Sequence, residues 1–195
     1  MGGKIMTDGT WDSRRDYKST GGKMRIIGID PGTAKMGVCY ISGSMKHPSF
    51  DCSLRVSDKK MTIDAKFQFM IAYAIVEIDA NNPELVVCEY PFSIQGHAKV
   101  LVEMFGALRY HCLINDIPFL ALSQSRLKKY ATGVGKDVEK SAMVMRAYKE
   151  YGLDLSDDQS DAFWIAHVGM TYLYGSPVKF RQESVDDIKK KEKKK

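Results

Sequence analysis

The pattern of hydrophobic and polar residues predicts three strands at the start of the fold. An apolar run over Met24–Asp30 stops at its terminal carboxylate, turns through Pro31 and Gly32, and resumes at Met36. This arrangement predicts two antiparallel strands joined by a tight turn, because glycine supplies unusual backbone angles and proline presets the turn. The alternation of Ser49–Val56 then predicts a third strand.

The next stretch predicts helices that alternate with strands. Apolar residues at helical spacing indicate a helix over Met61–Asp79, and Glu84–Tyr90 is the short continuous apolar run typical of a strand buried on both faces. A helix over Gly96–Asn115 and a short strand over Ile117–Leu122 follow. Because strands joined through helices run parallel, the pattern predicts an α/β fold with a mixed five-stranded sheet flanked by helices.

The remaining apolar periodicity is helical. It predicts a short helix over Ser123–Ala131 and, after two glycines, another over Asp137–Tyr151. Ser156 followed by Gln159 forms a capping box, so we expect the last helix to begin there and to run to about Tyr174.

Length and composition are consistent with one folded domain. The 195 residues are 44% hydrophobic, and no apolar run approaches the roughly 20 residues of a membrane helix. We expect residues 1–23 to be a disordered leader, residues 24–176 to fold, and the charged, lysine-rich residues 177–195 to be a disordered tail. The leader lacks the apolar segment of a secretory signal, so a cytoplasmic location is expected.

The cysteines form no CxxC pair and lie mostly in apolar contexts, so we expect neither zinc nor a disulfide but reduced core thiols. They are Cys39, Cys52, Cys88 and Cys112.

The net charge of +5 comes from the two ends of the chain, and the segment between them is neutral. Within that segment one strip holds six bases against two acids, which suits a polyanion partner, although a solvated helix face explains such a strip equally well. The six bases are Arg126, Lys128, Lys129, Lys136, Lys140 and Arg146.

Acidic residues end two of the predicted strands and begin the last predicted helix. Asp30 and Glu89 close their strands, where the functional crevice of an open α/β sheet lies. In the DDQSDA run, Asp158 is three residues from Asp161 and Asp157 is four, so helical spacing allows either to share a face with Asp161.

A cluster of carboxylates is costly unless a cation relieves the repulsion, and all-oxygen ligands favour magnesium or manganese over zinc. Two such ions about 4 Å apart can activate a water and stabilise the leaving oxygen of a phosphodiester. Strand-end solubility and favourable interaction with a helix dipole would explain each acid singly, but explain their joint placement less well.

Four motifs carry a family resemblance over Met24 to about Met170: IIGIDPGTAKMGV, VVCEYPF, LKKYATGVGKDVEKS and DDQSDAFWIA. In this order they resemble the RuvC family of Holliday-junction resolvases, within the RNase H-like nuclease superfamily. The resemblance implies a magnesium-dependent endonuclease with two ions per site, acting as a homodimer on four-way DNA junctions. The leader and the lysine-rich tail depart from the family pattern and indicate a divergent or phage-type member.

The resemblance also assigns individual residues. The catalytic and metal-binding acids would be Asp30, Glu89, Asp158 and Asp161, where the DxxDA phrasing selects Asp158 over Asp157. Phe92 matches the aromatic residue that inserts at the junction, and an exposed aromatic side chain can stack on an unpaired base. The family's basic residues match Lys128 and Lys140, although one residue is inserted before Lys140. Lys128, Lys129 and Lys136 can also bind phosphates non-specifically.

Two other classes of protein share part of this pattern. The turn after Asp30, with Gly37 beyond it, is similar to the phosphate loop of actin-like and sugar-kinase ATP-binding proteins, but those need two such domains. A non-catalytic DNA-binding module would need only the basic strip and tails.

Overall fold

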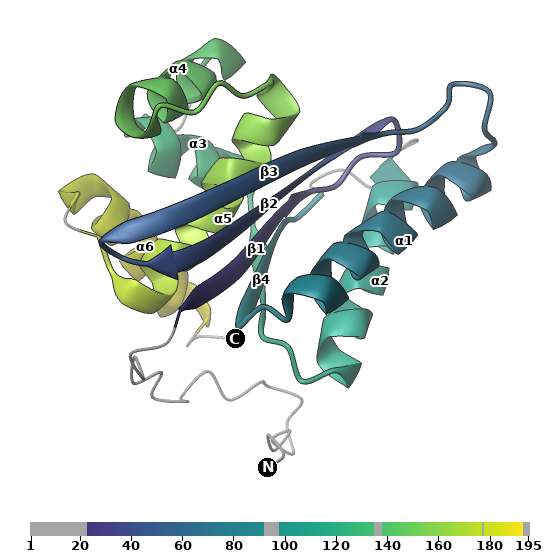
Figure 1. Ribbon diagram of the computed structural model, residues 1–195, viewed down its shortest axis with the longest axis horizontal. Coiled ribbons are helices and arrows are strands. Elements are labelled where there is room, and N and C mark those ends of the chain that lie inside the picture. The colour runs from purple at the N-terminus through teal and green to yellow at the C-terminus, as the bar shows by residue number, and fades with distance from the viewer. Residues whose placement is uncertain (1–22, 92–97, 135–137, 177, 193–195) are drawn as a thin grey trace.

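The computed structural model describes residues 23–91, 98–134, 138–176 and 178–192 (Figure 1). The predicted leader, apart from Lys23, lies outside the described residues.

One five-stranded sheet organises the fold, in the order β3-β2-β1-β4-β5. Strands β1 (Met24–Asp30), β2 (Lys35–Ser44) and β3 (His47–Val56) form an antiparallel meander. Strands β4 (Leu85–Glu89) and β5 (Phe119–Leu122) continue the sheet parallel to β1. The predicted mixed sheet is therefore confirmed.

Helices cover both faces of the sheet, as Figure 1 shows. One face packs on α1 and α2, and the other on α3 to α6, so the apolar core is divided into two layers. The helices are α1 (Ile63–Asn81), α2 (Ala98–Ile114), α3 (Gln124–Thr132), α4 (Lys140–Tyr151), α5 (Asp157–Tyr174) and α6 (Lys179–Glu192).

Helix α5 lies at the centre of the second layer. It begins with the predicted capping box, in which the Ser156 hydroxyl accepts from the Gln159 N–H and the Gln159 side chain accepts from the Ser156 N–H. Every residue from Ser160 to Thr171 is buried. A helix that is buried on all sides must be covered by the sheet on one side and by other helices on the other. Helix α5 therefore lies between the sheet and helices α3, α4 and α6.

Two glycines allow α5 to lie directly on the sheet. A Cβ atom on Gly28 of β1 would lie 2.2 Å from the backbone nitrogen of Ala166, and one on Gly37 of β2 would lie 2.3 Å from the carbonyl oxygen of Asp158. No side chain fits at such distances. The first turns of α5 are therefore held against the carboxyl end of β1.

Residues 179–192 contradict the expectation of a disordered tail, because they form α6. Its buried residues recur at helical spacing, which is the pattern of an amphipathic helix packed on a core. They are Arg181, Ser184, Val185 and Ile188. Only two of these four residues are apolar, and charged residues surround them, so the pattern is hidden in the sequence.

Arg181 joins α6 to the core. Its side chain is 1% exposed, Nη2 lies 2.7 Å from Oε2 of Glu150, and the guanidinium group lies 4.7 Å from the centre of the Trp164 ring. A buried guanidinium needs a counter-charge, and the flat group also packs on an aromatic face. The ion pair therefore fixes α6 against α4 and α5.

His167 is a packed residue of α5. Its Nδ1 lies 2.7 Å from the Tyr130 hydroxyl and its Nε2 lies 2.5 Å from the Tyr151 hydroxyl. Burial, and then the positive charge of Arg181, lowers the pKa of His167 to about 3. The imidazole is thus neutral near pH 7 and belongs to the core.

The expectation of reduced cysteines is wrong for Cys39 and Cys52, which form a disulfide between β2 and β3. The two residues are direct partners in the antiparallel ladder. Side chains directly opposite each other on one face lie within bonding reach, and the sequence does not reveal this register. Cys88 and Cys112 are free and buried, as expected.

Candidate active site

Asp30 and Glu89 end two neighbouring parallel strands. Ile29 of β1 pairs with Cys88 of β4, so Asp30 and Glu89 occupy the next position on each strand. Ile29 and Cys88 belong to the core layer under α1 and α2. Because side chains alternate along a strand, Asp30 and Glu89 face the other side of the sheet, where α5 lies.

The pKa of the buried Cys88 thiol is affected by both carboxylates. Burial is the main cause that raises its pKa well above the usual value, and the negative charges of Asp30 and Glu89 raise it further. The carboxylates of Asp30 and Glu89 therefore both lie near the Cys88 thiol, at the end of β4. Each is half-buried, at the boundary between the sheet and solvent.

The first turns of α5 bring two more acids to this edge. Gly37, which contacts the backbone of Asp158, is the ladder partner of Asp30, so the start of α5 lies over the end of β1. Asp161 is only 9% exposed, and the Asp158 side chain is 25% exposed. Asp157 is exposed to solvent. The fold thus turns Asp158, rather than Asp157, toward the protein.

Lys35 is a neighbour of the site that the sequence did not reveal. Its Nζ lies 3.6 Å from Oδ2 of Asp158, and its side chain is 57% exposed. An ion pair this open to solvent contributes little stability, but it places positive charge among the acids. Only the antiparallel return of β2 brings Lys35 here, so no local motif could have identified it.

The donor set has the chemistry of a hard-cation site. Asp30, Glu89, Asp158 and Asp161 supply only carboxylate oxygens, and Cys88 faces the opposite side of the sheet. Over the described ranges, no three His, Cys, Asp or Glu side chains are grouped closely enough to enclose a metal ion. The acids are thus gathered at one edge without forming a closed ligand shell. Ligands of this type suit magnesium or manganese.

The residues predicted to bind DNA are only partly described. Lys128 and Lys129 lie on α3, the first half-buried and the second exposed. Phe92 and Lys136 lie outside the described residues, and Lys140 begins α4 with a side chain that is also outside them. Arg146, from the same basic strip, forms an ion pair with Glu150, in which Nε lies 2.6 Å from Oε1.

The mixed five-stranded sheet, in the order β3-β2-β1-β4-β5 with helices on both faces, defines an RNase H-like fold. No protein-family model matches the chain. The crossover junction endodeoxyribonuclease RuvC of Carboxydothermus hydrogenoformans is 32% identical over 162 residues, which cover 78% of this chain and 99% of that protein. The chain therefore belongs to the RuvC family.

Other relatives agree with this assignment. The RuvC protein of Gloeobacter violaceus is 26% identical and covers 75% of this chain and 87% of that protein. The structure of Thermus thermophilus RuvC matches with a TM-score of 0.61 at 19% identity, over 73% of this chain and 91% of that chain. A second structure of that protein, in complex with a Holliday-junction substrate, matches equally well. The two structures show the shared fold.

None of the helices in the described ranges has both the length and the apolar character needed to cross a membrane.

Proposed function

We propose that this protein is a magnesium-dependent endonuclease that resolves four-way DNA junctions in the cytoplasm of a bacterium or of a phage-infected cell. The observation that carries the proposal is the position of Asp30 and Glu89. They stand side by side at the ends of β1 and β4 and face the helix that bears Asp158 and Asp161. Membership of the RuvC family supplies the substrate class.

In the proposed mechanism, each acid is a ligand positioned by rigid structure. Asp30 and Glu89 extend from buried strands, and Asp158 and Asp161 extend from a helix locked onto β1 and β2. Two bound magnesium ions, or manganese in their place, would activate a water and stabilise the leaving oxygen. The protein's own contribution is to hold four carboxylates near one another despite their repulsion.

Contacts with DNA would come from the aromatic and basic residues that the family resemblance and the basic strip identify. We assign Phe92 to stacking on a base at the branch point, and Lys128, Lys129, Lys136 and Lys140 to phosphate contacts. Stacking on an aromatic side chain contributes about 1 to 3 kcal/mol per base, and each neutralised phosphate makes binding more sensitive to salt.

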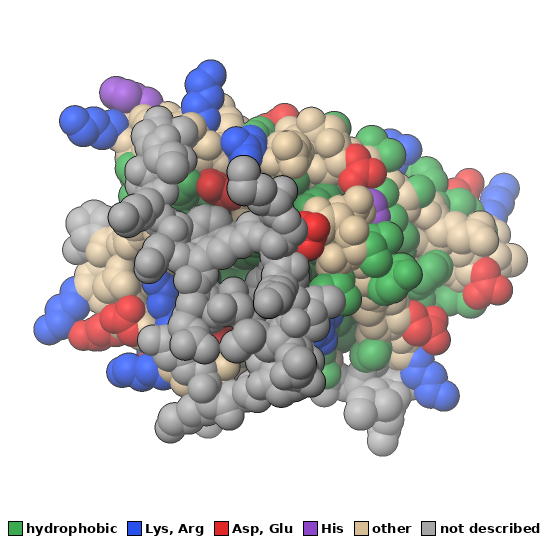
Figure 2. Space-filling model, turned by 90° about the horizontal axis from the view of Figure 1, so that it is seen from below, with side chains coloured by type: hydrophobic (Ala, Val, Ile, Leu, Met, Phe, Trp, Pro, Cys, Tyr) green, Lys and Arg blue, Asp and Glu red, His purple; other side chains and the backbone are tan. Residues whose placement is uncertain are grey.

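The proposed homodimer would form through α2. Exposed apolar residues gather toward the C-terminal end of this helix, and Figure 2 shows hydrophobic side chains over the surface that α1 and α2 form. They are Tyr110, Leu113 and Ile114, and Val102 is exposed nearer the start of the helix. Exposed apolar residues gathered on one helix are typical of an association site, and a two-fold dimer suits a two-fold symmetric junction.

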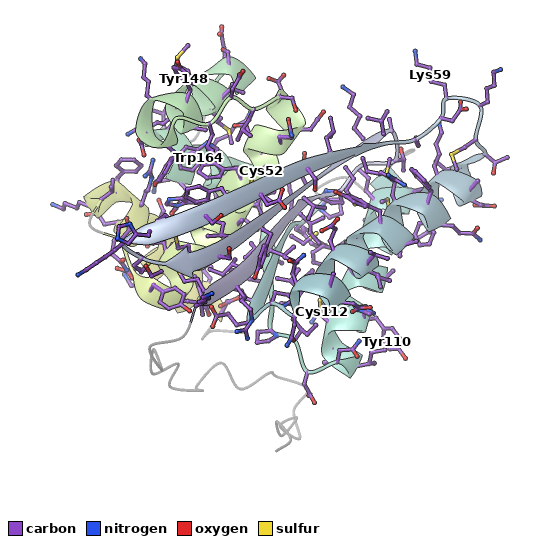
Figure 3. All side chains as sticks on the ribbon, in the orientation of Figure 1. Cys52, Lys59, Tyr110, Cys112, Tyr148 and Trp164 are labelled. Carbon is purple, nitrogen blue, oxygen red and sulfur yellow. A yellow bond between two sulfur atoms is a disulfide. The ribbon has the colours of Figure 1, made fainter. Side chains whose placement is uncertain are left out.

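We expect Tyr110→Asp to raise the dimer dissociation constant at least about 100-fold, because an aspartate placed in an apolar interface is desolvated without a partner. Tyr148→Asp is the matched control, since both tyrosines are exposed on helices and lie far apart in Figure 3. Sedimentation equilibrium measures the effect. An unchanged dimer with Tyr110→Asp, or equal weakening by both substitutions, would remove α2 from the interface.

The proposed function predicts that the protein cuts a synthetic four-way junction in the presence of magnesium, and leaves a linear duplex of matched sequence intact. Labelled strands separated on a denaturing gel show the cuts, and chelation of the metal should abolish them. Equal cutting of both substrates would indicate a general nuclease. Junction binding without any cutting, with magnesium or manganese, would indicate a non-catalytic DNA-binding module instead.

A further inference from the structure

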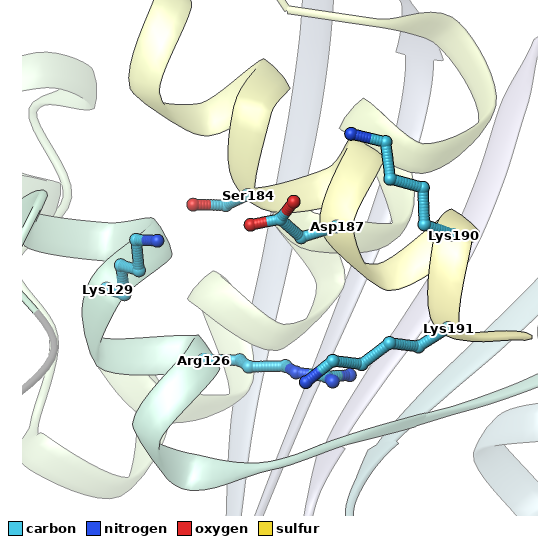
Figure 4. Close-up of a pocket in the computed structure, with 6 residues that line it drawn as sticks. All are labelled: Arg126, Lys129, Ser184, Asp187, Lys190 and Lys191. Atoms are coloured by element: carbon cyan, nitrogen blue, oxygen red, sulfur yellow. The ribbon is translucent and has the colours of Figure 1, made fainter.

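A pocket with a volume of about 420 Å³ lies between α3 and α6 (Figure 4). The pocket exists because α6, a segment that the sequence predicted to be disordered, folds onto α3. Its walls are formed by Arg126, Lys129, Ser184, Asp187, Lys190 and Lys191.

The pocket concentrates positive charge. Two basic side chains of α3 and two of α6 face a single carboxylate, that of Asp187. The Ser184 hydroxyl donates its proton to the carbonyl of Phe180 at 2.9 Å, so the donors that remain available in the walls are the cations. Like charges that line one pocket repel one another, and a ligand with several anionic oxygen acceptors would relieve that repulsion.

Helix-dipole effects explain only half of this arrangement. Lys190 and Lys191 lie in the last turn of α6, where cations are favoured. Arg126 lies in the first turn of α3, where the dipole disfavours a cation and where no acid is present. Its position therefore calls for another explanation, and a bound anion supplies one.

One wall of the pocket starts close to the proposed cleavage site, whereas the last turn of α6 packs on Tyr172, at the opposite end of α5 from Asp158 and Asp161. Helix α3 begins two residues after Leu122, which pairs with Glu89. With a rise of 1.5 Å per residue, Arg126 and Lys129 lie about 5 and 9 Å along the helix from Ser123. Because phosphates follow one another every 3.4 Å along the axis of each DNA strand, DNA cut beside Glu89 would pass within reach of this pocket.

We propose that the pocket between α3 and α6 binds the phosphodiester backbone of one arm of the DNA substrate, away from the bond that is cut. This inference rests on the proposed function and adds a second place of contact between the protein and the DNA, apart from the cleavage site. Helix α6 is joined to the core by the buried Arg181, so the backbone that carries Lys190 and Lys191 is in place before DNA binds. Preorganised cations lose less entropy on binding than flexible ones.

The test compares two doubly substituted proteins with the wild type. Lys190→Ala with Lys191→Ala removes the α6 side of the pocket. Lys46→Ala with Lys179→Ala removes the same charge from exposed positions that do not line it, one of them on α6 itself. The dissociation constant for a four-way junction is measured without divalent metal from about 50 to 200 mM salt, and cutting is measured with magnesium at saturating protein.

The pocket variant should bind the junction about tenfold or more weakly, and the slope of log K against log salt should become shallower by about 1.8, the value for two lost phosphate contacts. The control should stay close to wild type. The rate of cutting at saturation should be retained, and the melting temperature of the pocket variant should stay close to that of the wild type, because relief of repulsion offsets the lost interaction with the helix dipole.

Three results would overturn the inference while leaving the proposed function intact. They are equal weakening by both variants, a lower melting temperature in the pocket variant alone, and micromolar binding of inorganic phosphate or ATP that the pocket substitutions abolish. The last would indicate a site for a small phosphate ligand. A wild-type protein that neither binds nor cuts junctions would instead refute the proposed function, and this inference with it.

Discussion

Replacement of Asp30 by asparagine is expected to reduce junction cutting at least about a thousandfold, which corresponds to about 4 kcal/mol of lost transition-state stabilisation. Asparagine keeps the size of the side chain and removes the charge that a metal ligand at the end of β1 would supply. Binding of the junction should be retained or improved, because one negative charge near the phosphates is lost. Single-turnover cutting and a binding titration without metal separate the two effects.

Asp157→Asn is the matched control. Asp157 is exposed and adjoins Asp158 in the first turn of α5, so its loss should change the rate less than about threefold if Asp158 is the ligand. A large loss with Asp157→Asn and none with Asp158→Asn would reassign the ligand. Full activity of the Asp30 variant would show that this edge of the sheet takes no part in DNA cleavage.

Gly28→Ala is expected to lower the free energy of unfolding by about 3 kcal/mol or more, because the new methyl group would meet the backbone of α5. The nearest atoms would be the nitrogen of Ala166 at 2.2 Å and the carbonyl oxygen of Ala162 at 2.5 Å. A helix backbone cannot yield without moving the whole helix. For a domain of this size the loss lowers the melting temperature by about 6 to 12 °C.

Gly106→Ala separates this packing effect from the general effect of replacing glycine. A Cβ atom at Gly106, in the middle of α2, would meet nothing within 4 Å. The free energy of unfolding should stay constant or rise by up to about 1 kcal/mol, since alanine is the better helix former. Similar losses in both variants, measured by urea denaturation, would show that α5 does not bear on β1 through Gly28.

Cutting should also fall in the Gly28 variant at temperatures where it remains folded. The displaced helix carries Asp158 and Asp161, and a shift of about 1 Å in a catalytic group can cost a hundredfold in rate. This effect is expected without any change at the acids themselves.

Much of the fold could be predicted because its signals are local. The continuous apolar run of β4, the helical spacing of α1 and the capping box of α5 each involve neighbouring residues, and each predicted the element within a few positions. Helix α6 was missed because two of its four buried residues are polar, and Arg181 is buried only through its contacts with Glu150 and Trp164. The disulfide was missed because it depends on the register of β2 and β3.

The sequence by itself determined the order of strands and helices as far as α5, the α/β class, and the candidate acids at strand ends and at the start of α5. Only the tertiary structure showed that Asp30 and Glu89 face the same side, that Asp158 lies inward as the family motif implies, that Lys35 lies beside it, and that α3 and α6 enclose a basic pocket. The physical reason is the distance along the chain between the residues that interact. Periodicity and capping arise from neighbouring residues, whereas strand register and glycine-mediated contact arise between segments far apart in the chain.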